Sequence, residues 1–387
     1  MRNFTIGSIT KIPIRLNITL VVFLPLLAYL ISRPEQLAAY ATAVELVSPH
    51  AVDPDALASG QTPILLGITA AVGLFASVLV HELGHSWTAR YFDVGITSIT
   101  LWIFGGMAHM EELPEDWNVE FWIAIAGPIT SLVLAGGFFA ALQVVPASAP
   151  LVLYVVGLLA VLNVSLAVFN MLPAFPMDGG RVLRALLARR RPYASATRTA
   201  AAVGQGFAVV MAIVAVLSGA LLLLLIAMFI YVAASAESRT TVVRDLLRGI
   251  TVRDLLTDRG DAVDAGDSVQ TLLERIVTER RNGYPVVDGT ELVGLVTLAE
   301  LRDVEPDERD SRRVSDVMRA DPPTIGPDAD AFEALMLISK ERTDRIVVTE
   351  NGQVYGTISQ RDLMTALETT QGLGDISKTD LDADGYA

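Results

Sequence analysis

The sequence contains no cysteine among its 387 residues. A chain without cysteine forms no disulfide, supplies no thiolate to a metal and has no cysteine nucleophile for catalysis. Any metal centre must therefore be built from histidine and carboxylate side chains. Only four histidines occur, so histidines that stand close together are the first candidates for such a centre.

Lysine is almost as scarce. Lys11, Lys340 and Lys378 stand beside 26 arginines, whereas Asp and Glu number 43 and leave a formal net charge of −14. This acidity argues against nucleic acid as a partner, because phosphate binding requires a cationic face. Excess acid with little lysine favours a halophilic host with high cytosolic salt. A GC-rich genome that uses arginine codons would explain the scarce lysine but not the acidity.

The acidic residues are concentrated in the C-terminal part of the chain. Residues 237–387 hold 31 acidic and 18 basic residues, which leaves 12 and 11 for residues 1–236. The chain as a whole is 52% hydrophobic, with a mean hydropathy of +0.48. This composition predicts a membrane domain over residues 1–236 and a soluble, acidic region behind it.

Six apolar stretches approach the length of about 20 residues that crosses a hydrocarbon core. They are Ile14–Ile31, Ile64–Ala89, Phe121–Val144, Leu151–Leu172, Ala200–Leu217 and Ala220–Ala234. Only Ser218 and Gly219 separate the last two, which predicts a tight turn. The predicted fold class is a polytopic α-helical membrane protein of about six transmembrane helices with a C-terminal α/β domain.

Basic residues crowd one connection between the predicted spans. Between the fourth and fifth spans lie Arg181, Arg184, Arg189, Arg190, Arg191 and Arg198. The predicted loop Ser32–Thr62 carries a single base, Arg33. Because positively charged loops stay on the cytoplasmic side, we expect a multi-pass cell-membrane protein with both termini in the cytoplasm.

A sequence repeat with an offset of 62 residues occupies the soluble region. The aligned pairs are Asp254 with Asp316, Gly294 with Gly356, Thr297 with Ser359, Glu300 with Asp362 and Leu301 with Leu363. Each copy predicts a strand, a helix, two strands and a helix. This region resembles a tandem pair of cystathionine-β-synthase-type (CBS) domains, at 250–306 and 313–368, after a linker at 237–249. Residues 369–387 are acidic, and we predict that they are disordered.

One motif in the second predicted span carries metal-binding chemistry: His81-Glu82-Leu83-Gly84-His85. Residues four apart face the same side of a helix, and two imidazoles at this spacing can share one Zn²⁺. Glu82 stands where it could act as the general base toward water. Ionisable groups in an apolar span are costly unless they are functional. The alternative is a helix end at which polar residues meet the membrane interface.

Asp178 is the candidate third ligand, since a catalytic zinc takes three protein ligands and keeps one open position. It lies in a segment, residues 170–180, that holds two prolines and two glycines. A helix that is broken within the membrane is tolerated where the irregular backbone lines a cavity, so this segment is expected to line one. Alternatively, Asp178 could cap the helix that follows it.

The two motifs together resemble the site-2 protease family of intramembrane metalloproteases (peptidase family M50). The resemblance rests on His-Glu-Leu-Gly-His and on Asn-x-x-Pro-x-x-Pro-x-Asp-Gly-Gly over residues 170–180, and on segments 104–108 and 127–131. It implies one zinc per chain and a membrane-protein substrate that is cut within a transmembrane segment. The implied zinc ligands are His81, His85 and Asp178, and the implied base is Glu82.

The same resemblance implies two further roles. Asn170 corresponds to a polar residue that holds the substrate or donates to the oxyanion, although it could instead cap its helix beside Pro173. Gly105 and Gly106 would belong to a short strand that pairs with the unwound substrate, or else to an ordinary turn. The two other histidines, His50 and His109, are not expected to be ligands.

Two functions of other classes compete with proteolysis. A CBS-gated transporter or channel could also carry intramembrane carboxylates along an ion path, but this leaves His81 and His85 unexplained. An inactive relative could act as a membrane binding protein, but the intact Glu82 speaks against it.

The CBS resemblance also implies an adenine nucleotide in the cleft between the repeats, where an Asp in a Ser/Thr-x-x-Asp pattern contacts the ribose. The second repeat has Thr357, Ser359 and Asp362, whereas the first has Thr297 and the longer Glu300. We therefore predict that the second repeat carries the better nucleotide site. Alternatively, Asp362 caps the helix that follows it, and the pair serves to form a homodimer.

Overall fold

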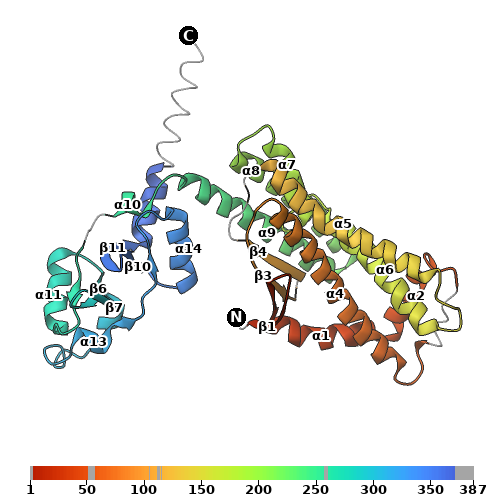
Figure 1. The fold of residues 1–387 in the computed structure, drawn as a ribbon, viewed down its shortest axis with the longest axis horizontal. Helices are drawn as coiled ribbons and strands as arrows, with labels where there is room; N and C mark the ends of the chain where they lie inside the picture. Colours follow the sequence, from red (N-terminus) through yellow and green to blue (C-terminus); the bar gives the residue numbers. More distant parts are fainter. Residues whose placement is uncertain are drawn as a thin grey trace, which may run out of the picture. The chain divides into compact units, whose positions relative to one another are not determined.

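The computed structural model describes residues 3–50, 57–103, 105–110, 114, 116–256 and 260–370 (Figure 1). It divides into two compact units, Met1–Arg239 and Thr240–Ala387. Two expectations fall outside the described residues: Phe104 of the glycine segment, and residues 371–387 of the predicted disordered tail.

Five helices of the chain are long and apolar enough to cross a membrane. They are α4 (Thr62–Tyr91), α5 (Trp117–Leu142), α6 (Pro150–Asn170), α8 (Tyr193–Ser218) and α9 (Leu221–Leu246). At a rise of about 1.5 Å per residue, even the shortest of them covers about 31 Å, which matches the hydrocarbon core of a bilayer. The second to sixth predicted spans are confirmed in these helices. Gly219, between α8 and α9, takes the left-handed conformation (φ 69°).

The first predicted span is wrong in its N-terminal part. Its first residues lie in strand β2 (Ile12–Asn17), and α1 (Ile18–Ile31) begins only after Asn17, whose side chain accepts a hydrogen bond from the Thr19 backbone N–H at 3.0 Å. The 14 residues of α1 cover about 21 Å, which is too short to cross a bilayer alone.

The predicted loop Ser32–Thr62 is also not all loop, because it contains α2 (Pro34–Glu45). This helix follows α1 after a bend of 77°. A proline at its first position starts α2, since the missing proline N–H would be unsatisfied there anyway. The helices α1 and α2 make a sixth span only if the bent pair counts as one.

A four-stranded sheet packs against α4 in the membrane unit, in the order β1-β2-β3-β4. Its members are β1 (Asn3–Ile9), β2, β3 (Ile96–Trp102) and β4 (Gly105–Met110), and only the central β2–β3 pair is parallel. Apolar side chains of β2 and β3, such as Ile12 and Ile99, are fully buried in one cluster with α4. The sequence indicated only the start of β4.

Small and polar residues bring the membrane helices together, as is usual where lipid removes the hydrophobic drive for association. Gly84 of α4 packs against Thr130 of α5, and a Cβ at Gly84 would overlap the Thr130 side chain. The buried Asn163 of α6 donates to Ser77 Oγ of α4 at 3.0 Å. A short helix, α7 (Asp178–Ala188), packs against α5 and α8.

The second unit contains the two predicted repeats. The first has α10 (Val252–Leu255), β5 (Val263–Asp264), α11 (Val269–Glu279), β6 (Gly283–Asp288), β7 (Glu291–Thr297) and α12 (Leu298–Leu301). The second has α13 (Val314–Val317), β8 (Arg319–Ala320), β9 (Thr324–Ile325), α14 (Ala331–Glu341), β10 (Arg345–Glu350), β11 (Gln353–Ser359) and a helix over residues 360–370.

The 62-residue offset holds in three dimensions. The strands β6 and β7 begin at Gly283 and Glu291, and β10 and β11 begin 62 residues later. Arg280 and Arg342, at the ends of α11 and α14, both take the left-handed conformation (φ 54° and 51°). The repeats form sheets in the orders β5-β6-β7-β8 and β11-β10-β9. The predicted strand and helix pattern is confirmed in both copies.

Candidate metal centre

The His81–His85 motif lies inside α4 rather than at its end, because the helix continues to Tyr91. His81 and His85 are one turn apart, and they are only 3% and 6% exposed. Their side chains face α5, where Gly127 lies opposite: a Cβ at Gly127 would overlap Nε2 of both imidazoles. The glycine thus leaves the space into which the two rings project.

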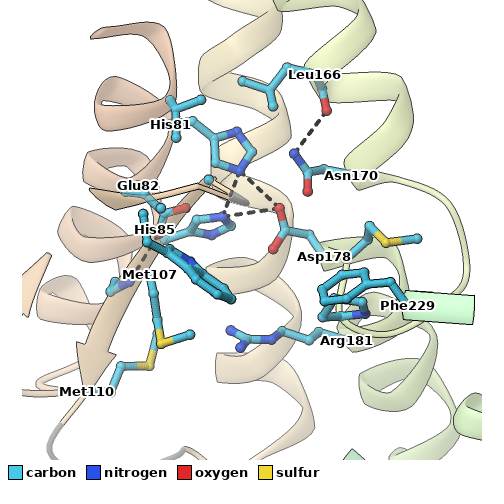
Figure 2. Close-up of a pocket in the computed structure, with 17 residues that line it drawn as sticks. His81, Glu82, His85, Met107, Met110, Leu166, Asn170, Asp178, Arg181 and Phe229 are labelled. Atoms are coloured by element: carbon cyan, nitrogen blue, oxygen red, sulfur yellow. Dashed lines mark hydrogen bonds and ion pairs between the residues drawn. The ribbon is translucent and has the colours of Figure 1, made fainter. Parts of the chain in front are cut away.

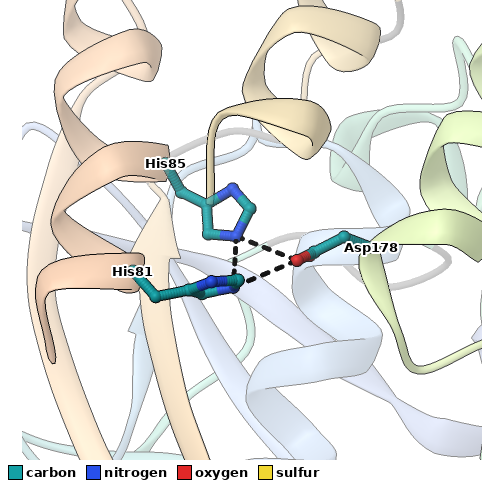
Figure 3. A group of neighbouring side chains, drawn as sticks. All are labelled: His81, His85 and Asp178. Carbon is teal, nitrogen blue, oxygen red and sulfur yellow. Dashed lines mark hydrogen bonds and ion pairs between the residues drawn. The ribbon is translucent and has the colours of Figure 1, made fainter. Parts of the chain in front are cut away.

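Asp178 is the first residue of α7, and it follows a turn that leads out of α6. The two glycines after it pack very closely on that turn: a Cβ at Gly179 would overlap the backbone of Met171 and Leu172, and one at Gly180 the backbone of Ala174. The position before the helix belongs to Met177, so Asp178 is not the helix cap. Instead, the Asp178 carboxylate points at the two histidines (Figure 3).

The three side chains converge on one point. Asp178 Oδ2 lies 3.1 Å from His81 Nε2 and 3.2 Å from His85 Nε2, and the two Nε2 atoms are 3.2 Å apart (Figure 3). Ligands about 2.0–2.1 Å from a tetrahedral zinc are separated from one another by about 3.3–3.4 Å. Two imidazole nitrogens and one carboxylate oxygen, with a fourth position open, are also the donor set of a catalytic zinc. The residues therefore fit a single zinc ion.

Outer hydrogen bonds orient both imidazoles. His85 Nδ1 lies 2.6 Å from the backbone carbonyl of Ile123, and His81 Nδ1 lies 2.9 Å from Ser131 Oγ. A carbonyl oxygen only accepts, so His85 Nδ1 carries the proton and Nε2 keeps the lone pair that a metal requires. The sequence indicated the 127–131 segment but not that Ser131 contacts His81.

We expect Ser131→Ala to weaken zinc binding by about 10–100-fold, the usual cost of removing an outer partner of a ligand. The substitution removes the one hydrogen-bond partner that His81 Nδ1 has among the described residues, and it changes little volume. Competition with a chelator of known affinity measures the change. Ser165→Ala is the matched control, because the described partner of its hydroxyl is the Val161 carbonyl of its own helix. Equal zinc affinity in Ser131→Ala and the wild type would contradict the orienting role.

Glu82 lies beside the centre and is held by strand β4. Its Oε2 accepts a hydrogen bond from the Ala108 backbone N–H at 3.2 Å. A Cβ at Gly106 would overlap the Glu82 side chain, so the strand can approach only because this position is glycine. Gly106, the second glycine of the Gly105-Gly106 pair, thus leaves the space that the Glu82 carboxylate needs beside the strand.

A cavity of about 280 Å³ opens beside these residues (Figure 2). It is lined from α4 by Val78, His81, Glu82 and His85; from β3 and β4 by Trp102, Gly105, Gly106, Met107, Ala108 and Met110; and from α6 to α9 by Leu166, Asn170, Pro176, Met177, Asp178, Arg181 and Phe229. All five site residues predicted in the membrane domain line this one cavity. One N–H of the Asn170 amide donates to the Leu166 carbonyl of its own helix at 3.0 Å. His109 and His50 are exposed and lie outside the lining.

The three residues predicted in the second repeat also share one cavity, of about 280 Å³. Asp362 Oδ2 accepts from the Ser359 N–H at 2.8 Å and from its hydroxyl at 2.7 Å. The N-cap of the helix is therefore Ser359, and Asp362, the third residue of the helix, completes a capping box with it rather than being the cap itself. Arg345 donates to the Thr357 hydroxyl at 2.7 Å. The basic residues that complete this cavity could not be recognised in the sequence. They are Arg280, Arg281, Arg345 and Arg361, with Asn282, Asp344 and Gln360.

Comparison with known proteins places the first site in a family. Residues 69–150 and 146–213 match the sequence profile of Peptidase family M50. A zinc metalloprotease of Methanocaldococcus jannaschii is 34% identical over 297 residues, which cover 76% of this chain and 83% of the relative. The chain belongs to peptidase family M50.

Two further proteins with similar sequences also carry protease names. A Mycobacterium tuberculosis protein provisionally named zinc metalloprotease Rip3 is 34% identical over 79% of this chain and 81% of its own length. The solved site-2 protease of Methanocaldococcus jannaschii is 32% identical; the match covers 62% of this chain and 96% of that one, with a TM-score of 0.43. Residues 250–307 and 314–369 match the CBS domain. The predicted family and the predicted CBS pair are both confirmed.

Proposed function

We propose that this chain is an intramembrane zinc metalloendopeptidase that cleaves transmembrane segments of membrane proteins. The observation that carries the proposal is the convergence of His81 Nε2, His85 Nε2 and Asp178 Oδ2 at 3.1–3.2 Å, buried among helices long enough to span a membrane. These three residues would hold one zinc ion. A transporter would have no use for Glu82 beside such a group.

Bound zinc would supply Lewis-acid chemistry, polarising the scissile carbonyl and making water easier to deprotonate. The protein supplies the proton transfers. The Glu82 carboxylate takes a proton from the attacking water and delivers it to the leaving nitrogen. The Ala108 N–H on Oε2 holds this carboxylate at the cavity wall. The free N–H of the Asn170 amide is available to the substrate, because only one hydrogen bond from this amide to the protein is present among the described residues.

The substrate segment would bind along β4. This strand ends the sheet order β1-β2-β3-β4, and its residues Gly105–Ala108 line the cavity beside Glu82. The outer edge of such a strand offers backbone N–H and C=O groups to an extended chain. A transmembrane helix that unwinds locally would exchange its internal hydrogen bonds for bonds to β4, and its backbone would become accessible to water.

The direct test uses purified protein in detergent and a tagged single-pass membrane substrate. We expect two fragments, and their masses should place the cut within the apolar segment. A zinc chelator such as phenanthroline should abolish the cleavage. Failure to cut any of a panel of membrane segments, or cuts only in the soluble flanks, would refute the proposal.

We also propose that both termini are cytoplasmic and that the host is halophilic. Arg184 is buried and Arg181 is a half-buried residue of the cavity lining, so the topology rests on Arg189, Arg190, Arg191 and Arg198, which are all exposed. Positive loops of this kind stay on the cytoplasmic side. Since the natural chain has no cysteine, single cysteines introduced in these loops can be labelled from either side of sealed vesicles to test the orientation.

The second unit would bind an adenine nucleotide and thereby regulate cleavage. Four arginines line the cavity of the second repeat, and its acidic lining residues are Asp344 and Asp362. Guanidinium groups are suited to phosphate oxygens. Asp362 remains available on its second oxygen, Oδ1, because both of its hydrogen bonds to Ser359 use Oδ2. The capping role and a ribose contact are therefore compatible.

We expect ATP, ADP or AMP to raise the melting temperature of the full chain, and Arg361→Gln to weaken binding by about 10–100-fold, as for the loss of one charged hydrogen bond. Isothermal titration gives the affinity. Arg302→Gln removes an exposed arginine of the first repeat that does not line this cavity, and it should bind like the wild type. No heat and no thermal shift at millimolar nucleotide would leave the CBS pair with the dimerisation role.

A further inference from the structure

Two arginines stand one turn apart on α7, and only one of them is ion-paired with residues that the structure describes. Arg184 is 2% exposed: its Nε lies 2.7 Å from Glu120 Oε1, and its Nη1 lies 2.6 Å from Glu237 Oε1. The rings of Phe175 and Tyr193 lie 5.0 and 4.9 Å from its guanidinium carbon. Two carboxylates and two aromatic faces thus stabilise this one buried cation.

Arg181 has no such environment. It stands three residues after Asp178, so both side chains lie on the same face of α7. Figure 2 shows it extending into the catalytic cavity below His85 and Asp178. It makes no hydrogen bond or ion pair with any residue that the structure describes. Glu120 lines a small neighbouring pocket together with Arg181. Oε1 of its carboxylate is taken by Arg184, and its buried Oε2 has no hydrogen-bond partner among the described residues, so Arg181 lies near this carboxylate without bonding to it.

No described carboxylate of the cavity lining is ion-paired with Arg181. The acidic lining residues that the structure describes are Glu82, which accepts from the Ala108 N–H, and Asp178, which contacts the two histidines. Among the described lining residues, Arg181 is the only arginine or lysine. A cation at membrane depth without a partner is costly, and such residues mark functional sites. An anion that forms in the cavity would give Arg181 the hydrogen-bonded partner that it lacks among the described residues.

We propose that Arg181 is a catalytic residue that donates hydrogen bonds to the scissile carbonyl oxygen as it becomes an oxyanion. This rests on the proposed proteolysis. As the water oxygen bonds to the carbonyl carbon, the C=O π electrons move onto the carbonyl oxygen, and Glu82 accepts the water proton. When the carbonyl re-forms, the C–N bond breaks, and the nitrogen leaves with that proton. Arg181 keeps its own protons throughout.

Arg181 is better suited to this charge than Asn170, the residue that the family resemblance suggests. The Asn170 amide has two N–H groups, and one is used by the Leu166 carbonyl. The Arg181 guanidinium presents five donors in a fixed planar fork and carries a full charge. A preorganised donor of this kind stabilises the transition state more than the ground state, so it acts on kcat.

Steady-state kinetics on a membrane-segment substrate test the role. We expect Arg181→Met to lower kcat about 10²–10³-fold, the usual effect of losing an oxyanion donor, with KM changed less than threefold and the zinc content unchanged. Free methylguanidinium should restore part of the activity, and Arg181→Lys should retain more than Arg181→Met. Arg198→Gln removes an exposed arginine outside the cavity and should behave like the wild type. A loss of zinc, a rise in KM alone, or full activity would each overturn the proposal.

A binding measurement tests the same role without turnover, and it separates this inference from the proposed proteolysis. A phosphinic peptide presents a tetrahedral anion where the scissile amide would be. We expect Arg181→Met to bind the phosphinic peptide at least tenfold more weakly than the wild type. The corresponding amide peptide is measured in the Glu82→Gln background, where it is not cleaved. There we expect Glu82→Gln and the double variant Glu82→Gln, Arg181→Met to bind it with equal affinity. Equal weakening of both ligands, or of neither, would show that Arg181 has no role at the oxyanion even if the wild type proves to be a protease.

Discussion

We expect His85→Ala to abolish zinc binding and cleavage together. Three ligands are the fewest that a catalytic zinc site in a protein usually has, and His85 supplies one of the three atoms that converge at 3.1–3.2 Å. The loss in zinc affinity should exceed the roughly 10–100-fold that removal of an outer partner costs. Metal analysis after gel filtration should give about one zinc per chain for the wild type and close to none for this variant.

The matched control for this variant is His109→Ala. His109 is an exposed histidine on β4, outside the cavity lining, so its removal tests for a general effect of losing an imidazole. We expect this variant to keep both zinc and activity. If His85→Ala retained a full zinc complement, or if His109→Ala lost it, the assignment of the ligands would be wrong.

Glu82→Gln separates the base from the metal. Glutamine has the same shape, and its amide oxygen can still accept the Ala108 N–H that holds Glu82. It cannot take a proton from water. We expect kcat to fall about 10²–10⁴-fold, the range that general acid–base catalysis contributes, with the zinc content unchanged. Fragment yield against time on a tagged membrane substrate, with metal analysis of the same preparation, measures both quantities.

Glu35→Gln is the control for loss of a negative charge. Glu35 is an exposed residue of α2 whose described ion pair is with Arg33, and its substitution should leave cleavage unchanged. Residual turnover of Glu82→Gln near the wild-type rate would mean that another group moves the proton. A loss of zinc in this variant would mean that Glu82 is a ligand.

The long membrane helices and the repeat could be predicted because their signals are local. A span such as Ile64–Ala89 is a continuous apolar run, and α4 follows it within two residues at each end. The 62-residue repeat fixed the strands and helices of the second unit, because paired residues such as Gly294 and Gly356 kept their places in β7 and β11. In each case the signal lies within one segment.

The sheet of the membrane unit escaped prediction for the opposite reason. Strand β2 pairs with β3, which lies more than 80 residues further along the chain, and an apolar strand beside an apolar helix looks like one long span. The polar Asn17 marks the boundary, since its side chain caps α1. A hydropathy average over about 20 residues does not detect one polar residue such as Asn17, so it does not show where the strand ends and the helix begins.

Part of the site was likewise invisible in the sequence. The spacing of His81 and His85 and the broken segment before Asp178 indicated the three converging residues. Gly127 and Ser131 belong to α5, and their proximity to the histidines depends on how α5 packs against α4. Arg181 was interpreted only as part of a basic loop, because only the folded chain shows that no described carboxylate is ion-paired with it.

Titration of the metal-free protein with zinc is the most direct measurement of the central claim, that His81, His85 and Asp178 hold one catalytic zinc. The protein is stripped with a chelator, and its circular dichroism is checked. Cleavage of a transmembrane substrate is then followed as zinc is added. We expect no cleavage without zinc, a linear rise in cleavage rate with added zinc, and a plateau at one zinc per chain. Full cleavage by the metal-free protein, or a plateau only at two zinc ions per chain, would contradict it.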